Sequence, residues 1–493
     1  MVRGYLKQGF AFAVIFFLLS TDHAHSFPYV SKKIKICTAV LSLVAVPAAI
    51  KWGPKYVIQG RTYLENRAPW NSDWKGVRSI RNGTLTPFWA QEIIGADLRP
   101  NLQQFKSSPR YVSIATMSGA YDYRLIDSYK LDGDIESVFQ SISPDLIPNA
   151  MKEHGTGVMN LLLGKSPIGI SKTAKLKIAL SDPRFYSSLQ GRSLKSLHDP
   201  QIELIHLSVA GLPREAVDIL NSFTESNHKV IVAGAGNRNV EISNDGSYQL
   251  HNLNAIVVGS IDPNGQVSSY SLPSSNVFIL APSGNYLQTI TKEKYMGGIY
   301  STLGKTSGAS ALVAGTVTDL LSLIPSLTQD EVKIILRKTA LPTSNSKHTK
   351  RQHGYGTLND AKVFYVAQRI LESKDFEKMS RIERKTFLES YDLYNFGVLS
   401  SKLFERGTQN LESPDPETWM TGLDQIRTAF NLNPLPQSQI ALIKAYYSKG
   451  MTSNAEFYAS FTFEARNLDH EEAAQLEARK SDISKPVATS NRR

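Results

Sequence analysis

Three polar side chains stand beside runs of small and apolar residues, in settings where they could take part in hydrolysis. Ser307 precedes a run that predicts a buried helix over 310–324, so it is either a nucleophile at a helix N-terminus or a helix cap. His154 lies just before the apolar helical run 157–164, and a histidine held at a helix start is well placed as a general base. Asn237 follows a buried strand, from where its amide could donate to a developing oxyanion. Each has an ordinary structural interpretation alone, so the hypothesis depends on their order along the chain.

These residues lie within a stretch, 109–362, whose pattern predicts an α/β fold with a parallel sheet and helices on both faces. The predicted strands are near-continuous apolar or β-branched runs at 111–116, 176–180, 202–209, 229–236, 255–261 and 277–281. The predicted helices lie among these strands, at 157–164, 213–227, 310–324 and 328–340. The last helix opens with a Thr328 cap and acidic residues in its first turn.

Beyond this stretch the strand pattern stops and amphipathic helical patterns follow. Residues 363–480 carry apolar side chains at helical spacing, for example Leu423, Ile426 and Phe430, and turns at prolines separate the patterns. The sequence therefore predicts a separate all-α C-terminal domain. The polar residues 481–493 predict a disordered tail.

The N-terminus has the features of an export signal. Basic residues precede the apolar run 10–19, and a polar stretch follows, which predicts a secretory signal peptide over 1–26. A second apolar stretch, 36–50, is shorter than the roughly 20 residues that span a bilayer comfortably and contains Pro47. It is either a membrane anchor or a buried helix packed on the following domain. Residues 27–108 are thus a possible anchor and a linker or pro-segment, and we expect a protein that is secreted, periplasmic or membrane-anchored with its main domain outside the cytoplasm.

The composition of the chain restricts the kinds of partner that we expect it to bind. The 493 residues are 41% hydrophobic and 20% charged, which is ordinary for a globular chain with more than one domain. The net charge of +11 would suit nucleic acid or an anionic membrane, but the basic residues are scattered and form no nucleic-acid-binding motif. We therefore expect no nucleic-acid partner. The single cysteine, Cys37, excludes an intramolecular disulfide and a cysteine-based zinc cluster.

Taken together and in order, these motifs resemble those of the subtilisin-like serine peptidases, over residues 109–362. The triplet His154-Gly155-Thr156 is similar to the family's histidine motif, and Asn237 matches its oxyanion asparagine. The residues Ser208, Val209 and Ala210 stand where the family usually has Ser-Leu-Gly, in the strand whose edge binds substrate main chain. Ser307 lies eight residues before Gly315, which is the family's spacing from nucleophile to helix glycine, whereas Ser310 lies only five before it.

The resemblance implies an acyl-enzyme mechanism on a polypeptide substrate. Ser307 Oγ would attack the peptide carbonyl, and His154 would take the proton and return it to the leaving amine. Asn237 and the Ser307 backbone N–H would hold the oxyanion. No cofactor is implied beyond structural calcium, which is common in the family, although no run of oxygen ligands here supports a particular calcium site.

The acid of the catalytic triad is the largest departure from the family pattern. The first predicted strand should end in Asp, but Thr116 or Met117 stands at that position. Asp127, 27 residues before His154, is an alternative acid, and Asp122 is a more remote one. Replacing the acid in such triads costs about ten-thousand-fold in rate, so its identity decides between activity and inactivity.

Further departures leave alternative functions open. Lys305 replaces the glycine before the nucleophile, Ala311 replaces the following proline, and Gly157 replaces the second histidine of the His motif. The first hypothesis is an exported serine endopeptidase that uses His154, Ser307 and Asp127. The second is a degenerate subtilase fold that binds polypeptide or a partner without cleavage. The third places the function in the C-terminal helices, on a scaffold with an inherited sheet domain.

Overall fold

The computed structural model describes residues 89–461, apart from short internal segments. The segments outside the description are 103–104, 106, 119–129, 131, 133–138, 141–148, 164–168, 181–195, 210–211, 213, 227–228, 238–251, 264, 272–276, 284–286, 290–300, 344–353 and 374. The predicted signal peptide, the apolar segment 36–50 and the C-terminal tail therefore lie outside the described residues, as do Asp122, Asp127 and Ala210. No helix within the described ranges is both long enough and apolar enough to cross a membrane.

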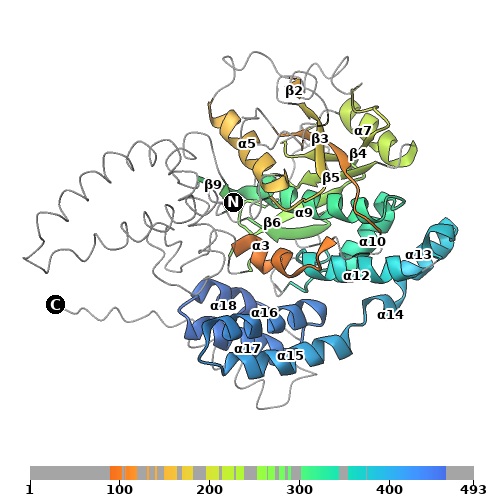
Figure 1. Ribbon diagram of the computed structural model, residues 1–493. Coiled ribbons are helices and arrows are strands. Elements are labelled where there is room, and N and C mark those ends of the chain that lie inside the picture. The colour runs from red at the N-terminus through yellow and green to blue at the C-terminus, as the bar shows by residue number, and fades with distance from the viewer. Residues whose placement is uncertain are drawn as a thin grey trace, which may run out of the picture. The chain divides into compact units, whose positions relative to one another are not determined.

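A seven-stranded sheet forms the centre of the described chain (Figure 1). Its strand order is β2-β3-β1-β4-β5-β6-β7 and every pairing is parallel, which confirms the predicted fold class. The strands are β1 Val112–Met117, β2 Phe139–Gln140, β3 Ala174–Leu180, β4 Ile202–Leu207, β5 Val230–Gly234, β6 Ile256–Ile261 and β7 Ile279–Pro282. The strand order reverses between β1 and β4, and a crevice for ligands opens at the carboxyl ends of the strands beside such a reversal. The site is expected there.

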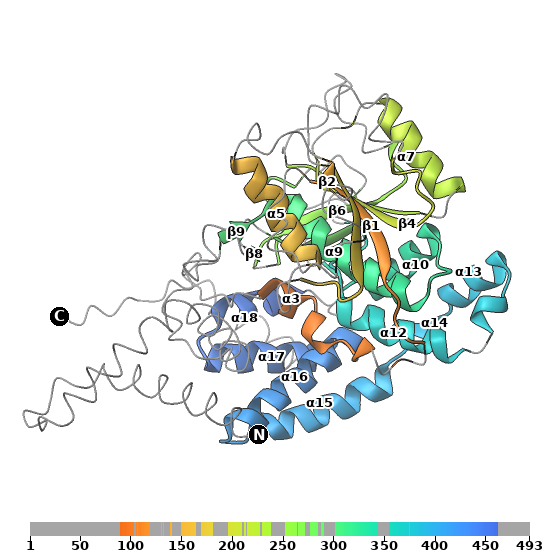
Figure 2. The ribbon, with the colours of Figure 1, turned by 45° about the horizontal axis from the view of Figure 1, so that its top comes forward.

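Four helices pack around the sheet: α5 Asn149–Leu163, α7 Arg214–Ser226, α9 Lys305–Leu323 and α10 Gln329–Thr339. In α9 every residue after Lys305 is buried, and the helix packs against β5, β6 and α5 (Figure 2). Small side chains allow this close packing, since a Cβ added at Gly315 would lie 2.8 Å from the Ile170 Cβ. The predicted cap of α10 is confirmed, because Thr328 and Glu331 form a capping box.

The helix α5 begins earlier than the sequence pattern predicted. Its first residue is Asn149 rather than residue 157, so His154 lies inside the helix and not at its start. The prediction followed the apolar run alone, and the polar residues before that run continue the same helix. The ring of His154 is therefore positioned by a full helical turn on either side.

From Asp360 onward every described element is helical, as predicted. The elements are α12 Asp360–Glu372, η9 Phe376–Lys378, α13 Arg381–Glu389, α14 Tyr391–Tyr394, α15 Gly397–Leu411, α16 Pro416–Leu432, α17 Pro436–Ser448 and α18 Thr452–Ala459. Two further helical segments precede the sheet, α3 Trp89–Ile93 and η2 Ala96–Leu98, and a short antiparallel pair precedes α9, β8 Leu287–Thr289 and β9 Ser301–Leu303.

The segment before the sheet is joined to the C-terminal helices by a buried arginine. Arg427 of α16 donates to the Glu92 carbonyl at 2.5 Å and pairs with Asp97 at 2.6 Å. The N–H of Asp360 donates to the Ile94 carbonyl at 2.8 Å. These contacts cross more than 260 positions of sequence, so α3 and η2 belong to the packed structure. The domain boundaries read from the sequence stay a prediction.

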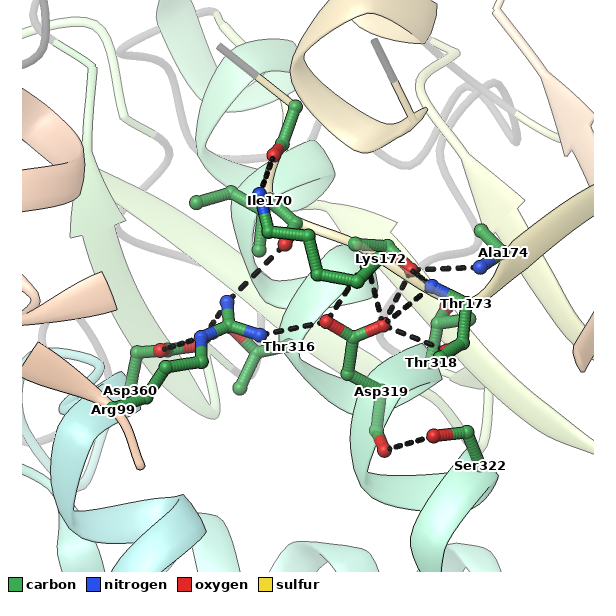
Figure 3. Close-up of polar contacts among 12 residues, drawn as sticks. Arg99, Ile170, Lys172, Thr173, Ala174, Thr316, Thr318, Asp319, Ser322 and Asp360 are labelled. Atoms are coloured by element: carbon green, nitrogen blue, oxygen red, sulfur yellow. Dashed lines mark hydrogen bonds and ion pairs between the residues drawn. The ribbon is translucent and has the colours of Figure 1, made fainter. Parts of the chain in front are cut away.

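A buried ionic cluster fastens the same segment to the central helix (Figure 3). The Arg99 Nη1 lies 2.6 Å from Oδ2 of Asp319 in α9, and its Nε lies 2.9 Å from Oδ2 of Asp360. The Asp319 carboxylate also accepts from the backbone N–H groups of Lys172 and Thr173, at 2.9 and 3.0 Å. Both carboxylates are completely buried, so each depends on these donors to replace water.

Candidate active site

His154 contacts the carboxyl end of β1. Its Nδ1 lies 2.8 Å from the carbonyl oxygen of Ser118, the residue that follows the strand. A carbonyl oxygen only accepts, so this contact assigns the proton to Nδ1 and leaves a lone pair on Nε2. Burial lowers the pKa of His154, and the bond to the Ser118 carbonyl opposes that shift only in part. The imidazole is therefore held neutral, in the tautomer that a general base requires.

No carboxylate bonds to His154 among the residues that the structure describes. Met117 is buried at the end of β1. Thr116 turns its hydroxyl toward another histidine, with Oγ1 3.1 Å from His206 Nδ1. The backbone carbonyl of Ser118 occupies the Nδ1 side of the imidazole instead. Asp127 and Asp122 lie outside the described residues, so their role stays a prediction.

Ser307 is the third residue of α9, and hydrogen bonds join this N-terminal end of the helix to the end of β5. Asn237 Oδ1 accepts from both the N–H and the Oγ1 of Thr306, at 3.0 and 2.9 Å. The N–H of Gly236, whose φ is 101°, donates to the same Thr306 hydroxyl at 3.1 Å. These bonds assign the Asn237 oxygen to Thr306. They leave its Nδ2, which bonds to none of the described residues, as a donor for another partner.

Lys305 begins α9 in a conformation that side chains rarely adopt. Its φ is 66°, and among the described residues it is the only one other than glycine with a positive φ. The left-handed conformation costs an L-residue about 1–2 kcal/mol, which explains why the family pattern has glycine there. The Lys305 side chain is exposed, so the substitution introduces backbone strain without requiring space in the core.

A second histidine, which the sequence motifs did not indicate, is buried near the site. His206 is a fully buried residue of β4, paired in register with Thr116 of β1. Its Nε2 lies 3.0 Å from Ser310 Oγ, and that hydroxyl donates to the Ser307 carbonyl at 3.0 Å. Burial, with a smaller contribution from His154, lowers the pKa of His206 to about 3. The only sign in the sequence was an imidazole between two apolar residues of a predicted strand.

The predicted substrate-binding residues lie at the end of β4. The Ser208 N–H donates to the Met117 carbonyl at 2.9 Å, which joins the ends of β4 and β1. The Ser208 hydroxyl is buried and bonds to none of the described residues. Val209 is partly buried beside it, and Ala210 lies outside the described residues. A role for Ser208, Val209 and Ala210 in substrate binding stays a prediction.

The three main candidates thus lie at the start of α9, after β5, or in contact with the residue after β1, and β4 separates these two strands in the sheet. His154 contacts the residue after β1, Asn237 follows β5, and α9 carries Ser307. The described residues contain no cluster of three or more metal-ligating side chains, and structural calcium also stays a prediction. A histidine base, a helix-borne serine and a free amide donor are the parts that acyl transfer requires.

The family is established by comparison with known sequences. The model of the subtilase family matches residues 95–356, which is more than half of the chain. The chain belongs to the subtilase family. This result confirms the resemblance seen in the order of the motifs.

Curated proteins that resemble the chain include bacterial and archaeal proteases. Subtilisin DY of Bacillus licheniformis is 31% identical over 131 residues, which are 26% of this chain and 44% of that protein. Subtilisin BL of Lederbergia lenta is 27% identical over 216 residues, or 42% of this chain and 75% of that protein. A halolysin-like extracellular serine protease of Natrialba magadii is 30% identical over 130 residues, or 26% of this chain and 22% of that protein. The chain thus spans less than half of subtilisin DY.

Two solved structures show a distant similarity to part of the chain. A structure of the subtilase cytotoxin SubAB has a TM-score of 0.46 and 18% identity, and the match covers 57% of this chain and 97% of that one. A PatG macrocyclase in complex with peptide has a TM-score of 0.44 and 18% identity, over 56% of this chain and 97% of that one.

Proposed function

We propose that this protein is a serine endopeptidase that hydrolyses peptide bonds of protein substrates. The observation that carries the proposal is the state of His154, whose Nδ1–H is bound to the Ser118 carbonyl so that Nε2 keeps its lone pair. The histidine lies on α5, which packs against α9, the helix that carries Ser307. Membership of the subtilase family supports the same chemistry.

In the proposed reaction Ser307 Oγ forms a bond to the carbonyl carbon of the substrate. His154 Nε2 takes the hydroxyl proton and then gives it to the leaving amine as the carbon–nitrogen bond breaks. Water hydrolyses the resulting ester by the same route, and the serine is regenerated. The N-terminal end of α9 favours the negative charge that develops during attack.

Asn237 supplies the proposed oxyanion donor. Its Oδ1 is occupied by Thr306, so the amide plane is fixed and Nδ2 is the end that remains to donate. Thr306 is the direct neighbour of Ser307, and the bonds between Asn237 and Thr306 support a role for the amide together with the backbone N–H of the nucleophile. Two donors at that point would hold the oxyanion of the tetrahedral intermediate.

We also propose that the protein acts outside the cytoplasm on polypeptide substrates. The predicted signal peptide over 1–26 and the extracellular character of one relative support this location. Membrane association through 36–50 is part of the same proposal. N-terminal sequencing of the protein recovered from its native host would test export, because a chain that still begins at Met1 contradicts cleavage after residue 26.

A fluorophosphonate probe tests the proposed nucleophile. We expect wild type to be labelled and Ser307→Ala to remain unlabelled. Ser322→Ala is a matched control, because Ser322 lies in the same helix and its hydroxyl bonds only to the Asp319 carbonyl one turn earlier. Hydrolysis of a chromogenic peptide should follow the same pattern. Equal labelling of Ser307→Ala and wild type would exclude Ser307 as the nucleophile.

A second candidate function is binding of polypeptide without cleavage. It is favoured by the lack of any carboxylate bonded to His154 among the described residues. In that case the protein would bind an extended peptide beside the residues that follow β4, and Ser307 would not react. A wild type that binds casein-derived peptides but neither reacts with fluorophosphonate nor cleaves them would support this function over the first.

A further inference from the structure

A chain of buried hydrogen bonds connects the residue that contacts His154 with the helix that carries Ser307. It begins at Ser118, whose carbonyl bonds to His154 and whose Oγ lies 3.1 Å from Thr116 Oγ1. It continues from Thr116 through both ring nitrogens of His206 to Ser310, and it ends at the Ser307 carbonyl. Ser118, whose carbonyl orients His154, is thereby linked to the first turn of α9, which carries Ser307.

The hydrogen bonds from Ser118 to Ser307 all run in one direction, since each group donates to the next one. Ser310 Oγ donates to the Ser307 carbonyl, so it accepts from His206, and the proton of His206 is on Nε2. His206 Nδ1 is then an acceptor for the Thr116 hydroxyl, which in turn accepts from Ser118 Oγ. A neutral imidazole suits this position because it presents one donor and one acceptor on opposite sides of the ring.

The surroundings of His206 keep it in this neutral form. The ring is completely buried between β1 and β5, opposite Thr116 on one side and Val232 on the other. His154 is the one titratable group among the described residues that shifts its pKa, and it lowers that pKa, as burial does. The chain of bonds therefore has the same direction across the working pH range of a peptidase.

We propose that Thr116 and His206 are positioning residues. They hold the Ser118 carbonyl as the Nδ1 acceptor of His154 and keep it aligned with Ser307, so that catalysis needs no carboxylate at this position. The inference rests on the proposed peptidase function. A carbonyl keeps the proton on Nδ1, as the acid of a triad does, and the large loss seen on replacing that acid comes from the wrong tautomer. The carbonyl lacks the full negative charge, so the imidazolium formed during reaction is stabilised less.

Paired substitutions separate positioning from simple packing. Thr116→Val removes the hydroxyl at nearly constant volume, and Thr116→Ser keeps it. His206→Leu removes both ring contacts, whereas His206→Asn restores one donor and one acceptor. Asp127→Asn tests the alternative acid. All five variants are compared by kcat and KM on a chromogenic peptide, by the pH profile of kcat/KM and by the rate of fluorophosphonate labelling.

We expect Thr116→Val and His206→Leu to lower kcat by about tenfold or more, since a net hydrogen bond is worth about that factor. KM should change little, and the acid limb of the pH profile should move, because the misplaced base is His154. Thr116→Ser and His206→Asn should recover most of the rate, and Asp127→Asn should match wild type. Melting temperatures identify any variant that loses activity because it unfolds. If Thr116→Val or His206→Leu unfolds, Thr116→Ser and His206→Asn provide the test.

Two results would overturn the inference while the peptidase stands. One is a loss of about ten-thousand-fold in Asp127→Asn, which would make that residue the acid. The other is equal rates for Thr116→Val and Thr116→Ser with the wild-type pH profile, which would make the hydroxyl irrelevant. If wild type itself neither cleaves nor labels, the proposed function fails first, and this inference fails with it.

Discussion

Replacing Arg99 should destabilise the protein more than any substitution of an exposed arginine. Arg99 is the cation shared by Asp319 and Asp360, both completely buried. Arg99→Met keeps much of the apolar stem but removes the charged guanidinium, which lies over the ring of Phe364. The two carboxylates then remain in the core with one fewer partner each.

The expected loss is about 3–5 kcal/mol, the usual effect of leaving a buried charge without its partner. Burial raises the pKa of Asp360, and Arg99 is the strongest influence that lowers it again. Without Arg99 that pKa rises further, so the folded state binds more protons than the unfolded state above the ordinary carboxyl pKa of 3.8. Stability of the variant therefore falls, relative to wild type, as pH rises from that value. One unit of additional pKa shift corresponds to about 1.4 kcal/mol.

Urea unfolding followed by circular dichroism at pH 5 and pH 8 measures both effects. Arg381→Met is the matched control, because Arg381 pairs with Asp330 at the surface, where such pairs contribute about 0–1 kcal/mol. Arg99→Lys keeps the charge without the planar fork and should fall between the two. Equal midpoints for Arg99→Met and Arg381→Met would refute the reasoning, as would a difference from wild type that shrinks when pH rises from 5 to 8.

Three further predictions concern the site. Asn237→Asp keeps the oxygen that binds Thr306 but loses the donor, so kcat should fall about a hundred- to a thousand-fold while the melting temperature stays near wild type; a rate within threefold of wild type would exclude Asn237 as an oxyanion donor. Burial lowers the pKa of His154, so the neutral, active base should persist on acidification, and the acid limb of kcat/KM should lie below the ordinary value of 6.5; a limb above 6.5 would indicate a nearby carboxylate. Lys305→Gly should stabilise the fold by up to about 1 kcal/mol, since relief of the left-handed strain exceeds the added chain entropy of glycine; a lower unfolding midpoint than wild type would contradict this account.

Six of the seven strands of the sheet and the cap of α10 followed from local sequence, whereas β2, β8 and β9 were not predicted. The runs at 202–209 and 255–261 became β4 and β6 with bounds that differ by at most two residues. A continuous apolar run must be buried on both faces, and a parallel sheet covered by helices satisfies that requirement. The capping box of α10 needed only residues three apart.

The start of α5 and the polar partners of the site did not follow from sequence. The polar residues before the apolar run gave no periodic signal, so the helix that contains His154 was predicted too short. His206 was marked in the sequence only as an imidazole between Ile205 and Leu207. The pairing of His206 with Thr116 depends on the register of β1 against β4, which are some 90 residues apart.

The sequence by itself determined the family, the parallel sheet and the order of the candidate residues, because periodicity, caps and motif spacing are local properties of a chain. Tertiary structure alone decided what each buried polar group bonds to. Burial removes water, so the Nδ1–H of His154 needs an acceptor and the carboxylate of Asp319 needs donors. Those partners are supplied by whichever distant strand or turn the packing brings within hydrogen-bonding distance.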